Sequence, residues 1–139
     1  MTELIIAEPQ PRYDTLPPLV VDCSVIAALV FNEAGSNEAQ KVMEGKALYA
    51  PWLIDHELIS VTLKKLDAGL SDIAHDGLLA FSRFPIIKSA TNLLDQVEIA
   101  QRHSLSAYDA AYLQLAAQIS APLATFDRKL GQAARKLLG

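Results

Sequence analysis

Four acidic residues occupy positions from which a carboxylate could do chemistry. Asp22 directly follows the apolar stretch "LVV", and Asp127 directly follows "LATF". Glu57 and Asp109 lie in segments with helical periodicity, each among apolar neighbours. Carboxylates that are brought together repel one another, so they need a compensating positive charge to remain ionised. Hard ions such as Mg²⁺ and Mn²⁺ bind carboxylate and water oxygens, and these residue types therefore point to a metal site.

Each acid also has a purely structural interpretation. An aspartate between a strand and a helix commonly caps the helix, which could explain Asp127. For Asp22 we expect the neighbouring Ser24 to be the cap instead. Ser106 and Asp109 have the spacing of a capping box at a helix start. These interpretations stay open at this point, because one pattern alone does not decide between a cap and a metal ligand.

Two neighbours of Glu57 could take its place in a metal site. Glu57 lies between Ile54 and Val61 on a largely apolar helix face, and it could be a boundary residue whose carboxylate reaches water. Asp55 would be the inward acid if the helix were rotated. His56 could be a metal ligand, although no Cys and His spacing typical of zinc occurs in the chain.

Short apolar strands alternating with helices must position these side chains. This order predicts an α/β domain with a central, mainly parallel sheet of four to five strands flanked by helices. Parallel strands end at the same edge of a sheet, where such folds bind their ligands. We expect strands at 19–22, 47–50, 85–89 and 122–126, and helices at 24–32, 36–45, 51–69, 71–84, 92–103, 106–119 and 127–138. Residues 1–18 hold four prolines and form a predicted extended arm, followed by a single domain at 19–139.

Composition narrows the class of protein. The 139 residues carry a formal net charge of −4, which argues against a general nucleic-acid coat. Cys23 is the single cysteine, so no intrachain disulfide is possible and a reducing cytoplasm is expected. No segment is apolar enough for a membrane span. Four basic residues share one predicted face of the last helix, either as a solvated face or as contacts to a substrate phosphate: Arg128, Lys129, Arg135 and Lys136.

Other enzymes with an acid at a strand end fit the sequence less well. A haloacid dehalogenase phosphatase has a second aspartate two residues after the first, where this chain has Ser24. A response-regulator receiver has paired acids after the first strand and a lysine on the last, and both are missing. Cys23 lacks the arginine spacing of a cysteine phosphatase loop and is expected to be a small buried residue.

The order of four short motifs resembles PIN-domain ribonucleases, and most closely the VapC toxins of bacterial toxin–antitoxin pairs. The motifs are "VVDCS", an acid in the helix after "PWL", "SAYDAAYLQLA" and "TFDRKL", and together they span residues 19 to about 131. The resemblance implies a three-layer PIN-like fold. It also implies an acidic metal site formed by Asp22, Glu57, Asp109 and Asp127. By the same match, Ser24 and Thr125 are expected to give polar support to that site.

The resemblance further implies an activity and partners. The expected reaction is metal-dependent hydrolysis of RNA by a two-metal mechanism, with Mg²⁺ as cofactor and Mn²⁺ as a substitute, leaving a 3′-hydroxyl and a 5′-phosphate. The expected partners are RNA, a second copy of the chain in a homodimer, and a small VapB-like antitoxin. A catalytically inactive PIN scaffold that acts as a protein-binding module is the alternative. The two differ in whether the acids bind metal.

Overall fold

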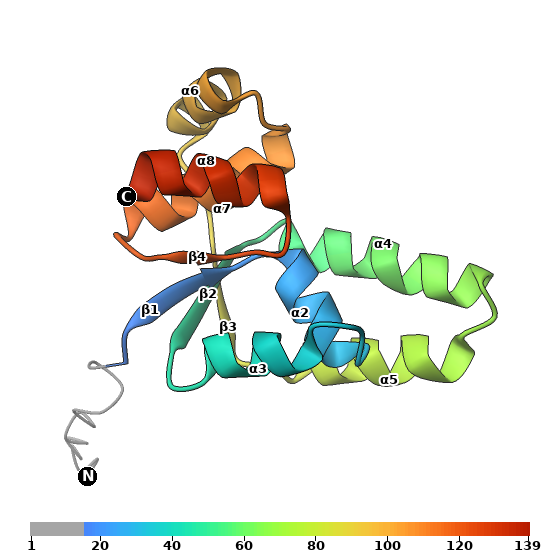
Figure 1. The fold of residues 1–139 in the computed structure, drawn as a ribbon. Helices are drawn as coiled ribbons and strands as arrows, with labels where there is room; N and C mark the ends of the chain where they lie inside the picture. The colour runs from blue at the N-terminus through green and yellow to red at the C-terminus, as the bar shows by residue number, and fades with distance from the viewer. Residues whose placement is uncertain (1–15) are drawn as a thin grey trace, which may run out of the picture.

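A four-stranded parallel sheet forms the centre of the molecule (Figure 1). The computed structural model describes residues 16–139, so most of the predicted arm at 1–18 lies outside the described residues. The strands are β1 (Pro18–Val21), β2 (Ala47–Pro51), β3 (Ile86–Ser89) and β4 (Leu123–Ala124), in the spatial order β3-β2-β1-β4. Every pairing is parallel, which confirms the predicted α/β class.

The strand register fixes which residues meet at the edge of the sheet. Val20 aligns with Leu123 and Val21 with Ala124, so β1 and β4 end side by side. The residues that follow them in the chain therefore emerge at the same edge. These residues include Asp22 after β1 and Thr125 and Asp127 after β4.

Seven helices flank the sheet in the part of the chain that the structure describes. They are α2 (Cys23–Val30), α3 (Ser36–Met43), α4 (Ile54–Asp67), α5 (Ser71–Ser82), α6 (Leu93–His103), α7 (Ala107–Gln118) and α8 (Arg128–Leu138). Helices α6, α7 and α8 lie together on one side, whereas α4 and α5 form an antiparallel pair that extends away from the sheet (Figure 1). None of the described helices combines the length and the apolar character that crossing a membrane requires.

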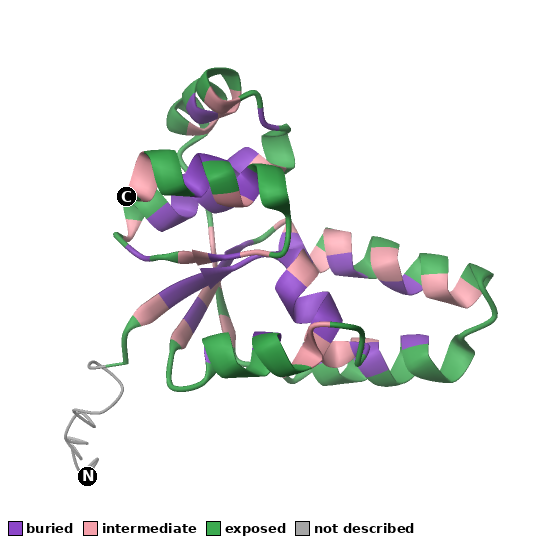
Figure 2. Ribbon diagram, viewed as in Figure 1, coloured by how far each residue is buried: buried purple, intermediate pink, exposed green. Residues whose placement is uncertain are grey.

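Helix α7 is the best-buried helix of its layer and carries one of the predicted site residues. All side chains from Ala110 to Ala116 are buried, and the helix packs against β1 and β2 (Figure 2). Its alanines let the helix approach the sheet closely, because they add little volume at the contact. The N-terminal turn of α7 therefore reaches the edge of the sheet at which β1 ends.

Two predicted helix starts were wrong. The N-cap of α2 is Asp22 and not Ser24, because the Asp22 carboxylate accepts the Val25 amide while the Ser24 hydroxyl is turned toward other partners. Pro51 does not open the long helix, since it is the last residue of β2 and aligns with Ser89. Proline has no amide hydrogen to give to a sheet, so the hydrogen bond to the Ser89 carbonyl comes from Trp52, and α4 begins only at Ile54.

Gly77 of α5 packs tightly against the C-terminal end of α2, and this contact gives a prediction on stability. A Cβ atom at Gly77 would lie 2.2 Å from the buried ring of Phe31 and 3.0 Å from the Val30 carbonyl oxygen. We expect Gly77→Ala to lower the free energy of unfolding by about 1–3 kcal/mol through overpacking. The matched control is Gly131→Ala in α8, where the added Cβ has an ordinary 3.8 Å contact. In a urea titration, Gly131→Ala should leave the free energy of unfolding unchanged or raise it. An equal loss of stability in Gly77→Ala and Gly131→Ala would contradict the packing argument.

Candidate active site

Asp22 is buried at the end of β1, with both carboxylate oxygens engaged. It is 5% exposed. Its Oδ1 accepts the Val25 amide at 3.2 Å and the Ser24 hydroxyl at 2.6 Å. Its Oδ2 accepts the hydroxyl of Thr125. This set of donors holds the carboxylate in one orientation and supports its charged form.

Ser24 and Thr125 also tie the ends of two strands together. The Ser24 oxygen accepts the amide of Phe126 at 3.0 Å, and the Thr125 oxygen accepts the amide of Asp127 at 2.9 Å. Each hydroxyl therefore donates to Asp22 from one side and accepts a backbone amide of the β4–α8 loop on the other. The structure thus places both residues beside Asp22.

Glu57 points toward α7 from the first turn of α4. Its Oε1 accepts a hydrogen bond of 2.5 Å from the hydroxyl of Tyr112, a residue that is almost fully buried. Sequence reasoning missed Tyr112 as a site residue. A signal existed in its position three residues after Asp109, which places it near Asp109 on the α7 surface.

The two competitors of Glu57 lie elsewhere. Asp55 forms an ion pair with Lys88 of β3 at 2.7 Å, so its charge is balanced by a lysine and not by the groups around Asp22. His56 is exposed. The rotation of α4 therefore directs Glu57, and neither neighbour, toward α7.

Asp109 and Asp127 differ in how their carboxylates are used. Ser106 caps α7 by accepting the Asp109 amide at 3.1 Å. Among the residues at 16–139, the Asp109 carboxylate accepts no hydrogen bond, so only half of the predicted capping box is present. Asp127 is exposed and caps α8 by accepting the Leu130 amide at 2.8 Å. Asp109 therefore has a carboxylate with no structural task, whereas Asp127 has one.

The four acids act on one another through their charges. Burial raises the pKa of Asp22, and the hydrogen bonds from Ser24 and Thr125 oppose this. Burial is also the largest cause of a raised pKa at Glu57, where the Tyr112 hydrogen bond lowers it and the charges of Asp22 and Asp109 raise it further.

The pKa of Asp109 follows the same logic. It is raised first by burial and then by the negative charges of Asp127 and Asp22, while Lys129 lowers it. Asp22, Glu57, Asp109 and Asp127 therefore lie within electrostatic range at one edge of the sheet. Such a group favours a bound cation, because a positive charge would relieve both the burial cost and the repulsion.

The side chains fit a hydrated hard ion better than a closed metal cage. Within residues 16–139, no three His, Cys, Asp or Glu side chains are grouped closely enough to hold an ion. Mg²⁺ commonly binds through one or two carboxylates and keeps several waters, so an open set of oxygen donors suits it. Cys23 does not add a soft ligand, because burial and the charges of Glu57 and Asp22 raise its pKa to about 12.

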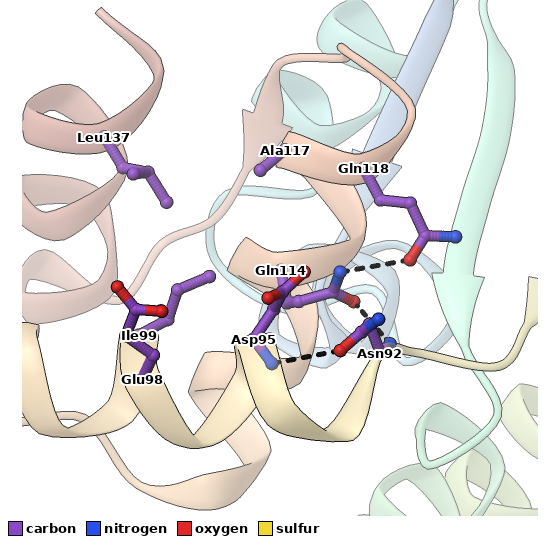
Figure 3. Close-up of a pocket in the computed structure, with 8 residues that line it drawn as sticks. All are labelled: Asn92, Asp95, Glu98, Ile99, Gln114, Ala117, Gln118 and Leu137. Carbon is purple, nitrogen blue, oxygen red and sulfur yellow. Dashed lines mark hydrogen bonds between the residues drawn. The ribbon is translucent and has the colours of Figure 1, made fainter.

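A cleft between α6, α7 and α8 is separate from these acids (Figure 3). It has a volume of about 340 Å³ and is lined by Asn92, Asp95, Glu98, Ile99, Gln114, Ala117, Gln118 and Leu137. The buried Gln114 accepts the Asn92 amide and donates to Gln118, each at 3.0 Å. Its polar groups are thus satisfied within the protein, and the contact joins the start of α6 to α7.

Removing the Tyr112 hydroxyl should change how Glu57 ionises. In Tyr112→Phe the carboxylate loses the hydrogen bond that lowers its pKa, so the pKa should rise further above its ordinary value. Proton competition would then shift Mn²⁺ binding toward higher pH, which calorimetry over a pH series would measure. Tyr49→Phe, on β2, is the control tyrosine variant. An unchanged pH midpoint of Mn²⁺ binding in Tyr112→Phe would contradict a metal-binding role for Glu57.

Known proteins share the sequence pattern and the fold of this chain. Residues 19–136 match the PIN domain family. The chain is 32% identical to Ribonuclease VapC3 of Pyrobaculum aerophilum over 82% of its length and 92% of the relative's. It is also 32% identical to Ribonuclease VapC9 of Mycobacterium tuberculosis, over 81% and 87% of the two chains. The crystal structure of PAE2754 from Pyrobaculum aerophilum shares the fold, with a TM-score of 0.67, 23% identity and coverage of 88% of both chains. The chain therefore belongs to the PIN-domain family, among the relatives of the VapC ribonucleases.

Proposed function

We propose that this chain is a Mg²⁺-dependent endoribonuclease of the VapC type, with Mn²⁺ as a substitute ion. The observation that carries the proposal is the buried Asp22 carboxylate, which is oriented by Ser24 and Thr125 and lies in the field of Glu57 and Asp109. A buried acid that shares its surroundings with further acids is typical of a site that binds a divalent ion. The names of the relatives supply the substrate class, RNA.

In this proposal Asp22 and Asp109 would hold the ions most directly, and Glu57 and Asp127 would complete the cluster, partly through waters. When bound, Mg²⁺ would supply the chemistry of a two-metal hydrolysis, polarising a water and stabilising the leaving oxygen. Ser24 and Thr125 keep the Asp22 oxygens aimed in one direction. Tyr112 does the same for Glu57 and shields one side of it from water. No side chain needs to become covalently attached to the RNA.

The same proposal includes partners and a compartment. The likeness to VapC proteins supports a small VapB-like antitoxin and a homodimer as partners. Helices α2 and α3 are one surface that an antitoxin could cover. Helix α2 is apolar and mostly buried, whereas α3 buries Ala39 and Met43 and has a largely polar outer face. Action in the cytoplasm is consistent with a single cysteine that is buried and unreactive.

One observation favours a second candidate, a PIN scaffold that binds protein without cleaving RNA. In the described part of the chain, no three acids enclose a metal position. Such a module would not need an ion, so metal binding separates the two candidates.

The deciding experiment is Mn²⁺ binding by calorimetry with the wild type, Asp22→Asn and Asp109→Asn. We expect binding in the wild type and its loss in both variants, with folding checked by circular dichroism. Asp72→Asn on the remote helix α5 is the matched control and should bind as the wild type does. A folded wild type that binds no Mn²⁺ would favour the protein-binding module. Asp109 would then have only the role of a residue in the capped first turn of α7.

A further inference from the structure

A second cleft, between the end of α6 and α8, is rich in positive charge. It has a volume of about 440 Å³ and is lined by Arg102, His103, Ser104, Lys129, Gln132, Ala133 and Lys136. The four α8 residues of this lining have the spacing of one helix face. Three basic residues in one cleft stand out in a chain whose net charge is −4. We name this feature the α6–α8 cleft.

The cations of the α6–α8 cleft are largely available to a ligand. Arg102 shares its charge with Glu98 in an ion pair. Among the residues at 16–139, Lys129 and Lys136 make no ion pair with an acid. The Nε2 atom of His103 is buried and has no hydrogen-bond partner within the described residues. His103 lines the cleft, but its buried Nε2 is not open to a ligand, so the cleft offers the two ammonium groups that are unpaired within the described residues.

Lys129 connects this cleft to the acidic site. It lines the cleft, and its charge also lowers the pKa of Asp109. It follows Asp127 by two residues at the start of α8. Lys136 lies two turns farther along, about 10 Å away at 1.5 Å per residue. A line of positive charge thus starts beside the acids and leads away from them.

We propose that the α6–α8 cleft binds backbone phosphates of the RNA that flank the cleaved bond. This inference rests on the proposed function, because it takes RNA as the substrate. The four acids repel a polyanion, so the chain needs cations nearby to retain one. At about 10 Å apart, the two lysines are far enough from each other to contact different phosphates of one strand. Lys129 contacts the phosphate nearest the acids, and Lys136 contacts one farther along the strand.

The test compares two double variants of α8 that remove the same charge at the same spacing. Lys129→Ala/Lys136→Ala changes the α6–α8 cleft, whereas Arg128→Ala/Arg135→Ala changes two basic residues outside its lining. The probe is a labelled, mixed-sequence single-stranded RNA of about ten nucleotides. Its binding is followed by fluorescence anisotropy in EDTA from about 50 to about 200 mM salt, so that no metal-dependent cleavage occurs.

We expect the lysine variant to bind this RNA about 25-fold more weakly at about 0.1 M salt. The salt slope is the change in log affinity per tenfold change in salt, and each phosphate contact to a single strand adds about 0.7 to it. Two contacts therefore add about 1.4 log units, or about 25-fold, between 1 M and about 0.1 M salt. The salt slope should fall by about 1.4 in the lysine variant and much less in the arginine variant. Equal losses in the two variants would overturn the proposal, since they would report net charge and not a site.

The outcomes for the cleft and for the proposed function can be told apart. Normal RNA binding by the lysine variant would overturn the cleft assignment even if the wild type cleaves RNA with Mg²⁺. If the wild type binds a poly-glutamate peptide and the lysine variant does not, while both bind RNA equally, the cleft would instead be assigned to an acidic protein segment. Conversely, a wild type that binds Mn²⁺ but cleaves no RNA would count against the proposed activity. In that case the lysine variant would still report on the cleft.

Discussion

Replacing Asp22 with asparagine should abolish Mg²⁺-dependent RNA cleavage, with kcat reduced by about 10³-fold or more. The change removes one charge from the acid with the most hydrogen-bond donors in the site, and several kcal/mol of transition-state stabilisation correspond to that factor. Asparagine keeps an oxygen that can cap α2, because it is as good an N-cap as aspartate. The fold should therefore survive while the rate is lost. Cleavage of a defined RNA, followed by gel electrophoresis over time, measures the effect.

The matched control for this prediction is Asp55→Asn. It also removes a carboxylate charge, but that carboxylate is paired with Lys88 and directed away from the site. We expect this variant to cleave at a rate close to that of the wild type. The assignment of Asp22 fails if Asp22→Asn retains wild-type turnover, or if Asp55→Asn loses as much activity.

The second large effect concerns how pH and metal control stability. Asp22, Glu57 and Asp109 have raised pKa values in the folded chain. The folded state thus binds these protons more tightly than the unfolded state. Their contribution to stability is fully present below the ordinary pKa values, at about pH 4, and is lost as pH rises through the raised values. Without metal, ionisation of these acids should lower the free energy of unfolding.

Divalent metal should reverse this penalty. An ion that binds only the folded state adds about 2.7 kcal/mol when its concentration is about 100 times Kd. We expect Mg²⁺ or Mn²⁺ to raise Tm by several degrees at neutral pH and to have little effect near pH 4, where protons compete for the same oxygens. Thermal unfolding at several pH values, with EDTA or with metal, tests this.

Asp109→Asn supplies the control for the pH argument. This carboxylate accepts no hydrogen bond among the described residues, so the variant loses charge but no contact. Without metal it should be more stable than the wild type at neutral pH, and the difference should shrink toward pH 4. With metal the order should invert. A constant difference across pH would show that Asp109 is not electrostatically coupled to the other acids.

The local features of the chain were largely readable from the sequence. Apolar runs broken by prolines, glycines and polar caps predicted the order of strands and helices, because these signals act over a few residues. The positions of Asp22 and Asp127 after two strands predicted that they would meet, since parallel strands end at the same edge. The start of the long helix was misjudged at Pro51, because the pairing of β2 with β3, and not local propensity, decides where that strand ends.

The details of the site depended on contacts between distant segments. The hydrogen bond from Thr125 to Asp22 joins residues 103 positions apart, and the bond from Tyr112 to Glu57 joins residues 55 positions apart. The choice of Glu57 over Asp55 follows from the rotation of α4, which places Lys88 beside Asp55. By itself, the sequence determined the fold class, because the order of strands and helices follows from local periodicity. It also nominated the four acids, through the resemblance of four motifs to PIN-domain ribonucleases. Only the tertiary structure decided which oxygens are held, by which donors and at what electrostatic cost, because burial and charge depend on neighbours that chain order does not specify.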